Sequence, residues 1–319
     1  MNQMKDEMIP VYILNGFLES GKTEFIKFTI AQPYFRSKET TLLLLCEEGE
    51  TEYEPELLRK TRTELEVIRN KADFTIENLE KLAEKHHPGR IIIEYNGMWN
   101  CKELYLPKFF GVEQQITIID ASTFSVYLTN MRSLVAEMVR KSELVIFNRC
   151  DGVKELSFFK RNIRAVNPRA EIVFEDSQGE INEMMEEELP YDLNADVIQL
   201  DRNGFGIWYL DMMEHPERYM GKTVSFTGMV LKPGDFPKNY FVPGRVAMTC
   251  CEEDMEFFGY VCQYDGTENL EEKSWIHVTA RVELEKFMAY QGGEGPVLHA
   301  VSITPEKEPE QPVIDFAAM

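Results

Sequence analysis

A stretch near the N-terminus has the residue types and spacing that are typical of loops that bind phosphate groups. It has the pattern Gly-x-x-x-x-Gly-Lys-Thr, and the residues expected to contact a nucleotide are Gly16, Glu19, Ser20, Gly21, Lys22 and Thr23. Glycines let the backbone turn its N–H groups toward an anion, and a following helix adds the positive end of its dipole. Lys22 would reach the β- and γ-phosphates, and the Thr23 hydroxyl would join the shell of a Mg²⁺ ion. An ordinary glycine turn is the alternative, but an apolar run before the loop and a helical pattern after it favour nucleotide binding.

Acidic residues that follow two other apolar runs would complete a Mg²⁺ site. Glu94 ends the run at 91–93, where a P-loop NTPase keeps the carboxylate that holds the ion. A strand-ending glutamate in a plain turn is the alternative. Gly97 stands where a GTPase keeps a glycine whose N–H senses the γ-phosphate, and Glu47 or Glu50 would assist on the switch side. The predicted catalytic residues are Lys22, Thr23 and Glu94, and those predicted around Mg²⁺ are Thr23, Glu94 and Glu47.

The tetrapeptide Asn148-Arg-Cys-Asp151 approximates the Asn-Lys-x-Asp motif that reads guanine. Asp151 would accept hydrogen bonds from the N1–H and the 2-amino group of guanine, a pairing that adenine does not offer. Asn148 would brace the loop and contact the base edge. Arg149 replaces the usual lysine, whose stem covers the base, and arginine is able to stack there as well. The motif favours GTP over ATP, while an ATP-dependent small-molecule kinase remains the alternative.

The elements that must position these residues alternate between strand and helix in the first half of the chain, which predicts an α/β fold with a mostly parallel sheet. The expected strands are 11–14, 41–45, 90–94, 116–120, 144–148 and 171–174. The expected helices are 24–31, 75–86, 122–126, 134–141 and 157–166. Ligands of such sheets bind outside the carboxyl ends of the strands, and the candidate residues above follow those ends.

The second half of the chain changes to a pattern of short strands after an acidic stretch near 176–196. We predict a P-loop domain at 1–195, a small all-β barrel of the OB type at 196–304, and a proline-rich acidic tail at 305–319. The expected strands of the barrel are 223–231, 240–248, 257–263, 275–282 and 297–303, after a helix at 207–215. A sandwich is the alternative to the barrel.

Composition limits the partners that the protein is expected to have. The chain has 319 residues and a net charge of −21, which argues against nucleic acid and anionic membrane surfaces as partners. It contains no apolar run long enough for membrane insertion, and its N-terminus is too polar and acidic for a signal peptide. We therefore expect a cytoplasmic protein whose six cysteines form no disulfide framework.

The order of the motifs resembles that of CobW-type GTPases, a metallochaperone-like family of P-loop proteins. The pieces that carry the resemblance are Asn15–Thr23, Glu47-x-Gly-Glu50, Ile93–Gly97, Asp120-Ala121, Asn148–Asp151 and Val166-Asn-Pro168. The resemblance implies binding of GTP and Mg²⁺, slow hydrolysis of GTP, and delivery of a transition metal such as zinc or cobalt to a target. It is also compatible with a homodimer. The family's Cys-x-Cys-Cys motif is absent from the matching zone at 63–71, and Cys46 stands where the family usually has asparagine.

The barrel-like half resembles the small C-terminal domain of a family of permease-associated proteins, which also carries an arginine followed by a Cys-Cys pair. Here these are Arg245 and Cys250-Cys251, with Cys262 further along the chain. Soft thiolates from Cys250, Cys251 and Cys262, with an acid such as Glu253 or Asp254, would select Zn²⁺ or Cu(I). Adjacent strand residues point to opposite faces, so both members of the pair ligate one ion only if the strand bulges. Buried apolar packing of the three thiols is the alternative.

These observations predict a GTPase that uses Mg²⁺ and hands a metal or a signal to an unidentified protein. The first competing hypothesis is a nucleotide-dependent interaction module that delivers no metal. The second is the ATP-dependent kinase mentioned above.

Overall fold

The computed structural model describes residues 8–181, 189–250 and 254–316 of the chain. The chain divides into two compact units, Met1–Met184 and Met185–Met319. Among the described residues, no helix is both long enough and apolar enough to cross a membrane.

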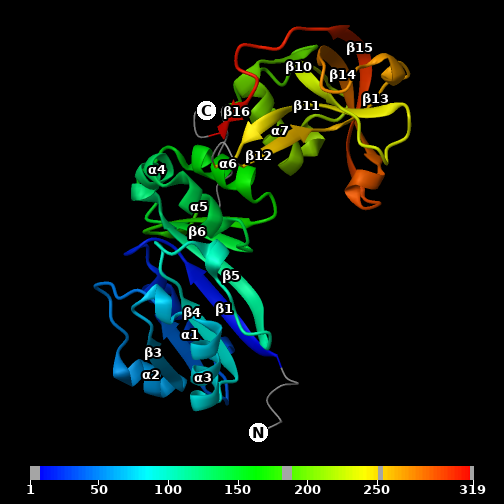
Figure 1. Ribbon diagram of the computed structural model, residues 1–319. Coiled ribbons are helices and arrows are strands. Elements are labelled where there is room, and N and C mark those ends of the chain that lie inside the picture. The colour runs from blue at the N-terminus through cyan, green and yellow to red at the C-terminus, as the bar shows by residue number, and fades with distance from the viewer. Residues whose placement is uncertain (1–7, 182–188, 251–253, 317–319) are drawn as a thin grey trace. The chain divides into compact units, whose positions relative to one another are not determined.

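The first unit is built on a sheet whose strands run in the order β3-β2-β4-β1-β5-β6-β7-β8 (Figure 1). All its neighbouring strands pair in parallel except the last two. The strands are β1 (Ile9–Asn15), β2 (Thr41–Leu45), β3 (Thr63–Val67), β4 (Arg90–Glu94), β5 (Phe110–Asp120), β6 (Leu144–Asn148), β7 (Glu171–Asp176) and β8 (Gly179–Glu180).

The helices of this unit cover both faces of the sheet, because successive strand residues point to opposite sides. They are α1 (Lys22–Ala31), α2 (Pro55–Thr61), α3 (Ile76–His86), α4 (Ala121–Asn130), α5 (Arg132–Val139) and α6 (Leu156–Val166). Ile91 and Ile93 of β4 share a core cluster with Leu79 of α3. Ile92, between them, lies in a second cluster with Ile26 of α1. The near-continuous apolar runs of the sequence therefore reflect burial on two faces.

The α/β fold and its mostly parallel sheet confirm the expectation from sequence, which did not include α2, β3 or the short strand β8. Of these, β3 lies in the zone at 63–71 where the cysteine motif of the CobW-type GTPases would stand. β3 pairs only with β2, at the edge of the sheet, and its sequence Thr-Glu-Leu-Glu-Val alternates polar and apolar residues. An edge strand of this kind lacks the solid apolar run by which the central strands were recognised.

The second unit is a barrel of five strands, as expected from sequence. β11, β13, β15, β14 and β10 follow one another, and a further pairing of β11 with β10 closes the ring. The strands of this unit are β9 (Ile198–Leu200), β10 (Thr223–Leu231), β11 (Tyr240–Met248), β12 (Met255–Gly259), β13 (Val261–Gln263), β14 (Trp275–Lys286), β15 (Glu294–Pro305) and β16 (Ile314–Asp315), and its helix is α7 (Arg202–Glu214). Phe205 and Trp208 of α7 pack their rings on Phe226 of β10, with centroids 5.0 and 5.4 Å away.

The strand expected at 257–263 is divided in two at Tyr260. β12 pairs with the second half of β11, from Gly244 to Met248, whereas β13 pairs with its beginning and with β15. One continuous strand cannot follow both partners, so the chain turns between them.

The segment expected to be a tail returns to this unit. Ile314 pairs in parallel with Ala247 of β11 and is fully buried. The ring of Phe316 is 1% exposed and lies 5.5 Å from the ring of Phe258, centroid to centroid. Arg202 Nε donates to the carbonyl oxygen of Val313 at 3.0 Å, which fixes the approach to β16. Proline and acidic residues dominate the sequence of this segment, yet its few apolar residues complete the core.

Replacing Phe316 by alanine is expected to destabilise the second unit by about 3 kcal/mol, the usual cost of truncating a buried phenylalanine. Hydrogen exchange of the β11 and β12 amides in the full chain measures the loss. Val301→Ala is the control, because Val301 is 69% exposed. If both variants protect these amides equally well, Phe316 does not hold this part of the barrel.

Candidate functional site

The phosphate-binding loop connects β1 to α1 and requires glycine for close packing rather than for flexibility alone. Gly16 has φ of +141°, and a Cβ there would lie 2.2 Å from the carbonyl oxygen of Ile118 in β5. Gly97, after β4, packs against the loop itself, since a Cβ there would lie 2.2 Å from the carbonyl oxygen of Gly16. The two glycines therefore bring the loop, β5 and the segment after β4 into contact at the carboxyl edge of the sheet.

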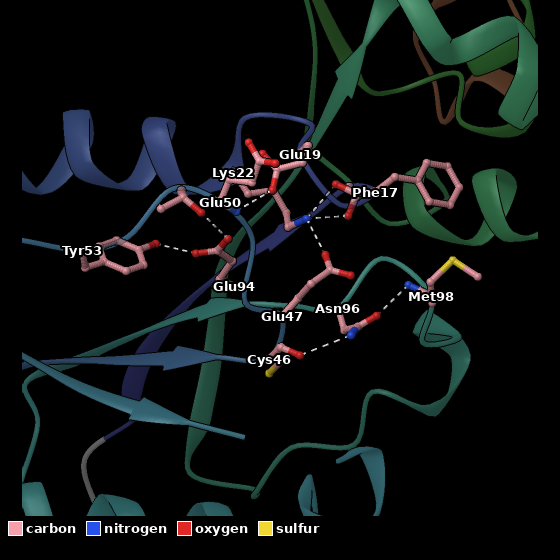
Figure 2. Close-up of polar contacts among 12 residues, drawn as sticks. Phe17, Glu19, Lys22, Cys46, Glu47, Glu50, Tyr53, Glu94, Asn96 and Met98 are labelled. Atoms are coloured by element: carbon pink, nitrogen blue, oxygen red, sulfur yellow. Dashed lines mark hydrogen bonds and ion pairs between the residues drawn. The ribbon is translucent and has the colours of Figure 1, made fainter. Parts of the chain in front are cut away.

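Lys22 is buried at the centre of this loop, with a side chain only 4% exposed. Its Nζ donates to the carbonyl oxygens of Gly16 and Phe17, both at 2.8 Å (Figure 2). Its third contact is an ion pair with Glu47 Oε2 at 2.9 Å. An ammonium group held this way is aimed at the concave side of the loop, where a phosphate would compete with the Glu47 carboxylate for it.

Thr23 and Glu94 lie together beside Lys22, as the sequence predicted. Thr23 Oγ1 donates to Glu94 Oε1 at 2.8 Å, and the hydroxyl of Tyr53 donates to Glu94 Oε2. Glu94 is 2% exposed, and burial raises the pKa of its carboxyl group despite these hydrogen bonds and the nearby Lys22. A buried carboxylate next to a hydroxyl is a set of hard oxygen donors that needs positive charge, so these residues fit a Mg²⁺ ion.

The segment after β2 covers the loop through three contacts from successive parts of its length. The first is the Glu47–Lys22 pair just described. The backbone N–H of Glu50 donates to Glu19 Oε1 at 2.7 Å, and the hydroxyl of Thr51 donates to Glu24 Oε1 at 2.7 Å. A narrow pocket lies beneath this cover, and its lining residues are Leu18, Glu19, Gly21, Lys22, Thr23, Glu24, Glu47, Gly49, Thr51 and Glu94. Glu47 thus lies in the predicted site, with its carboxylate on Lys22 rather than on Thr23.

The residues predicted to read guanine approach the same loop from β6. Asn148 Nδ2 donates to the carbonyl oxygen of Ser20 at 2.7 Å, so this side chain braces the loop. Arg149 has φ of +54°, and its guanidinium donates to the carbonyl oxygen of Glu19 at 2.8 Å and to Asp120 Oδ2 at 2.5 Å. Asp120 caps α4 by accepting from the N–H of Ser122 at 2.9 Å. The arginine in place of lysine is therefore anchored to the loop and to the end of β5.

Asp151 has a partner that sequence reasoning missed. The N–H of Ser177 lies 3.1 Å from Asp151 Oδ2, and the Ser177 hydroxyl donates to Oδ1 at 2.6 Å. These hydrogen bonds from Ser177 hold the pKa of the exposed Asp151 carboxyl below its usual value. Ser177 lies in the turn between β7 and β8, and the only sequence signal for it is the turn-forming run Asp-Ser-Gln-Gly.

The cysteines predicted to bind a transition metal are not brought together among the residues that the structure describes. Cys262 on β13 pairs with Phe241 at the beginning of β11, whereas Cys250 follows the end of β11. Cys251 and the candidate acid Glu253 lie outside the described residues. Cys250 Sγ donates to Asp254 Oδ2 at 3.1 Å. Across 8–181, 189–250 and 254–316, no three His, Cys, Asp or Glu side chains are placed to hold an ion.

Comparisons with known proteins give partial structural matches. The Zn(II)-bound YjiA GTPase from E. coli is 17% identical, with 55% of this chain and 60% of that chain covered and a TM-score of 0.41. The hydrogenase maturation factor HypB from Archaeoglobus fulgidus is 18% identical, with 54% and 82% covered and a TM-score of 0.41. HypB from Helicobacter pylori, solved with nickel, is 18% identical, with 53% and 80% covered and a TM-score of 0.36. This chain thus spans less than two thirds of the YjiA chain. No curated protein matches.

Family models cover nearly all of the chain. The DUF1980 C-terminal domain matches residues 175–314. The model described as CobW/HypB/UreG, nucleotide-binding domain, matches residues 10–174, which is more than half of the chain and includes the loop, Glu94 and Asp151. This protein therefore belongs to the CobW/HypB/UreG family, with a DUF1980 C-terminal domain after its nucleotide-binding domain.

Proposed function

We propose that this protein binds GTP and hydrolyses it with the help of Mg²⁺. The observation that carries the proposal is the buried Thr23–Glu94 pair next to Lys22 in the phosphate-binding loop. The family to which the chain belongs is described by its nucleotide-binding domain, which supports the proposal. The Asp151–Ser177 pair supports guanine, since an ionised carboxylate fixed by two hydrogen bonds is an acceptor for two neighbouring donors on a base.

In the proposed reaction, Lys22 and the N–H groups of the loop stabilise the charge that develops on the γ-phosphoryl group. Thr23 and Glu94 would hold Mg²⁺, which supplies Lewis-acid neutralisation of phosphate oxygens when it is bound. Asn148 connects the loop to the segment proposed to bind the base, through its hydrogen bond to the carbonyl oxygen of Ser20. Turnover in this proposal is slow and is accelerated by a partner, which would complete the positioning of the attacking water.

Measurement of phosphate release tests this proposal. GTP with Mg²⁺ is expected to give slow, saturable release of phosphate. ATP with Mg²⁺, and GTP in a buffer from which a chelator removes Mg²⁺, are expected to give little. Release from ATP at an equal or higher rate would support an ATPase instead.

Replacing Glu47 by glutamine is expected to strengthen binding of GDP about tenfold in a chelating buffer. The Glu47 carboxylate must leave Lys22 before a phosphate can take its place, and a charged hydrogen bond of this kind contributes roughly 1.5 kcal/mol. Titration with a fluorescent GDP analogue measures the change, and the absence of Mg²⁺ removes any effect on metal binding. Glu48→Gln is the control, because Glu48 pairs with the exposed Arg69. Unchanged or weaker binding by Glu47→Gln would contradict competition at Lys22.

The biological role of GTP hydrolysis is a second part of the proposal. Delivery of zinc or another transition metal to a target protein is one form, and a nucleotide-dependent interaction module without metal is the other. Zinc titration of the full chain, followed by thermal stability, separates them. Stabilisation that is lost in a Cys250→Ser, Cys251→Ser variant supports metal delivery, and no stabilisation supports the interaction module. A homodimer, a cytoplasmic location and an OB-type topology remain predictions from sequence.

A further inference from the structure

Tyr53 is a buried aromatic residue at the far end of the segment that covers the phosphate-binding loop. The residue is 8% exposed, and it lies in the core cluster that contains Ile26 of α1 and Leu45 of β2. Its hydroxyl points toward Glu94 and donates a hydrogen bond to it (Figure 2). The ring is therefore held by packing, while its only polar atom is directed at the predicted Mg²⁺ carboxylate.

The two oxygens of Glu94 have different partners. Oε1 accepts from Thr23 on the side of the phosphate-binding loop, and Oε2 accepts from Tyr53 on the side of the core. The Glu94 carboxylate accepts a hydrogen bond at each oxygen, so it cannot rotate freely. The packed ring of Tyr53 cannot shift to keep its hydrogen bond if the carboxylate rotates. The arrangement leaves Oε1, beside Thr23, as the oxygen that faces the loop. Partners of this kind orient a metal-binding side chain and influence metal affinity without touching the ion.

The contacts of the covering segment tie this carboxylate to the phosphate-binding lysine. Glu47, at the start of the segment, holds Lys22, and Tyr53, near its end, holds Glu94. Thr51 and Glu54, on either side of Tyr53, are fastened to Glu24 and Lys27 of α1 at 2.7 and 2.6 Å. The position of the Tyr53 hydroxyl is thus fixed by α1, the same helix that carries Lys22 and Thr23.

We propose that Tyr53 is a positioning residue for the Mg²⁺ site, whose hydroxyl holds Glu94 with one oxygen toward Thr23. This inference rests on the proposed GTP function and adds a residue outside the sequence motifs. Without the hydroxyl, Glu94 Oε2 is a buried acceptor with no donor, and the carboxylate turns to find another partner. The Mg²⁺ site then loses its prepared geometry, whereas the phosphate-binding N–H groups and Lys22 keep theirs.

The test compares Tyr53→Phe with the full-length wild-type protein. Mg²⁺ is titrated against a fixed concentration of a fluorescent GTP analogue, and binding of the analogue in a chelating buffer is measured separately. The variant is expected to need at least tenfold more Mg²⁺ for the half-maximal increase in binding of the analogue. This is the usual scale for a residue that hydrogen-bonds to a metal ligand. Its affinity in the chelating buffer is expected to stay within about twofold of wild type, and hydrolysis is expected to recover as Mg²⁺ is raised.

Tyr12→Phe is the matched control, because Tyr12 lies on β1 and packs its ring on Phe35. It is expected to show the wild-type Mg²⁺ requirement. An unchanged Mg²⁺ requirement in Tyr53→Phe would overturn the positioning role while leaving the GTP proposal intact. Equal losses of affinity for the GTP analogue with and without Mg²⁺ would also overturn the positioning role, since they indicate a purely structural role. If the wild-type protein binds neither GTP nor GDP, the proposed function itself fails.

Discussion

Replacing Lys22 by alanine is expected to weaken GTP binding by about 100-fold or more. The Lys22 side chain is 4% exposed and its ammonium group is held by two carbonyl oxygens at 2.8 Å, so it is already in position for a phosphate. A charge-assisted hydrogen bond to an anion contributes roughly 3 kcal/mol at such a site, which corresponds to this loss of affinity. Titration with a fluorescent GTP analogue measures it directly.

Lys81→Ala provides a matched control for this prediction. Lys81 lies on α3 and pairs with Glu77 at the surface. Its loss removes the same charge from the chain, so an effect of net charge would appear in both variants. If Lys22→Ala and Lys81→Ala bind GTP equally well, the loop between β1 and α1 is not the phosphate site.

Replacing Asp151 by asparagine is expected to weaken GTP binding by roughly 100-fold and to strengthen binding of xanthosine triphosphate. The Asp151 carboxylate offers only acceptors, which suit the N1–H and 2-amino group of guanine. Xanthine has an oxygen at position 2, and an asparagine amide can donate to it. The mismatch of guanine with the asparagine amide costs roughly 1.5–3 kcal/mol of binding free energy. The match of xanthine with the same amide contributes a similar amount. Competition titrations with the two triphosphates measure the exchange.

Asp192→Asn is the control for the loss of one acidic charge, since Asp192 accepts from the N–H of Asn194 in a turn of the second unit. It is expected to keep the wild-type preference. If Asp151→Asn weakens both triphosphates equally, Asp151 supports the fold of the turn with Ser177 rather than the choice of base.

The part of the candidate site that rests on local spacing could be predicted from the sequence. The loop from Gly16 to Thr23 is a contiguous motif, and Glu94 follows an apolar run that is recognisable by itself. The parallel sheet then brings them together, so that Thr23 Oγ1 and Glu94 Oε1 are 2.8 Å apart. Motifs at the ends of parallel strands are predictable in this way because the fold gathers strand ends at one edge.

The residues that were missed have no periodic or motif signal. Tyr53 is a single aromatic residue in an acidic segment, and only the packing of α1, β2 and β4 shows that its hydroxyl reaches Glu94. Ser177 meets Asp151 from another turn, 26 positions away along the chain. The register of β11 with β13 places Cys262 beside the beginning of β11, whereas Cys250 follows its end, and their spacing in the sequence does not reveal this separation.

The C-terminal segment shows the limit of composition as a guide. Proline and glutamate predicted a tail at 305–319, yet Ile314 and Phe316 are buried against the barrel. Two apolar residues are enough to fix a short strand when a neighbouring strand has free hydrogen-bonding groups.

Competition between GTP and ATP for the purified full-length protein, with Mg²⁺ present, tests the central claim most directly. A fluorescent GTP analogue is bound first and then displaced with each unlabelled nucleotide. We predict that GTP displaces it at a concentration at least 100-fold lower than ATP does, because only guanine satisfies the fixed Asp151 carboxylate. Displacement by ATP at an equal or lower concentration would contradict the account of this protein as a GTPase.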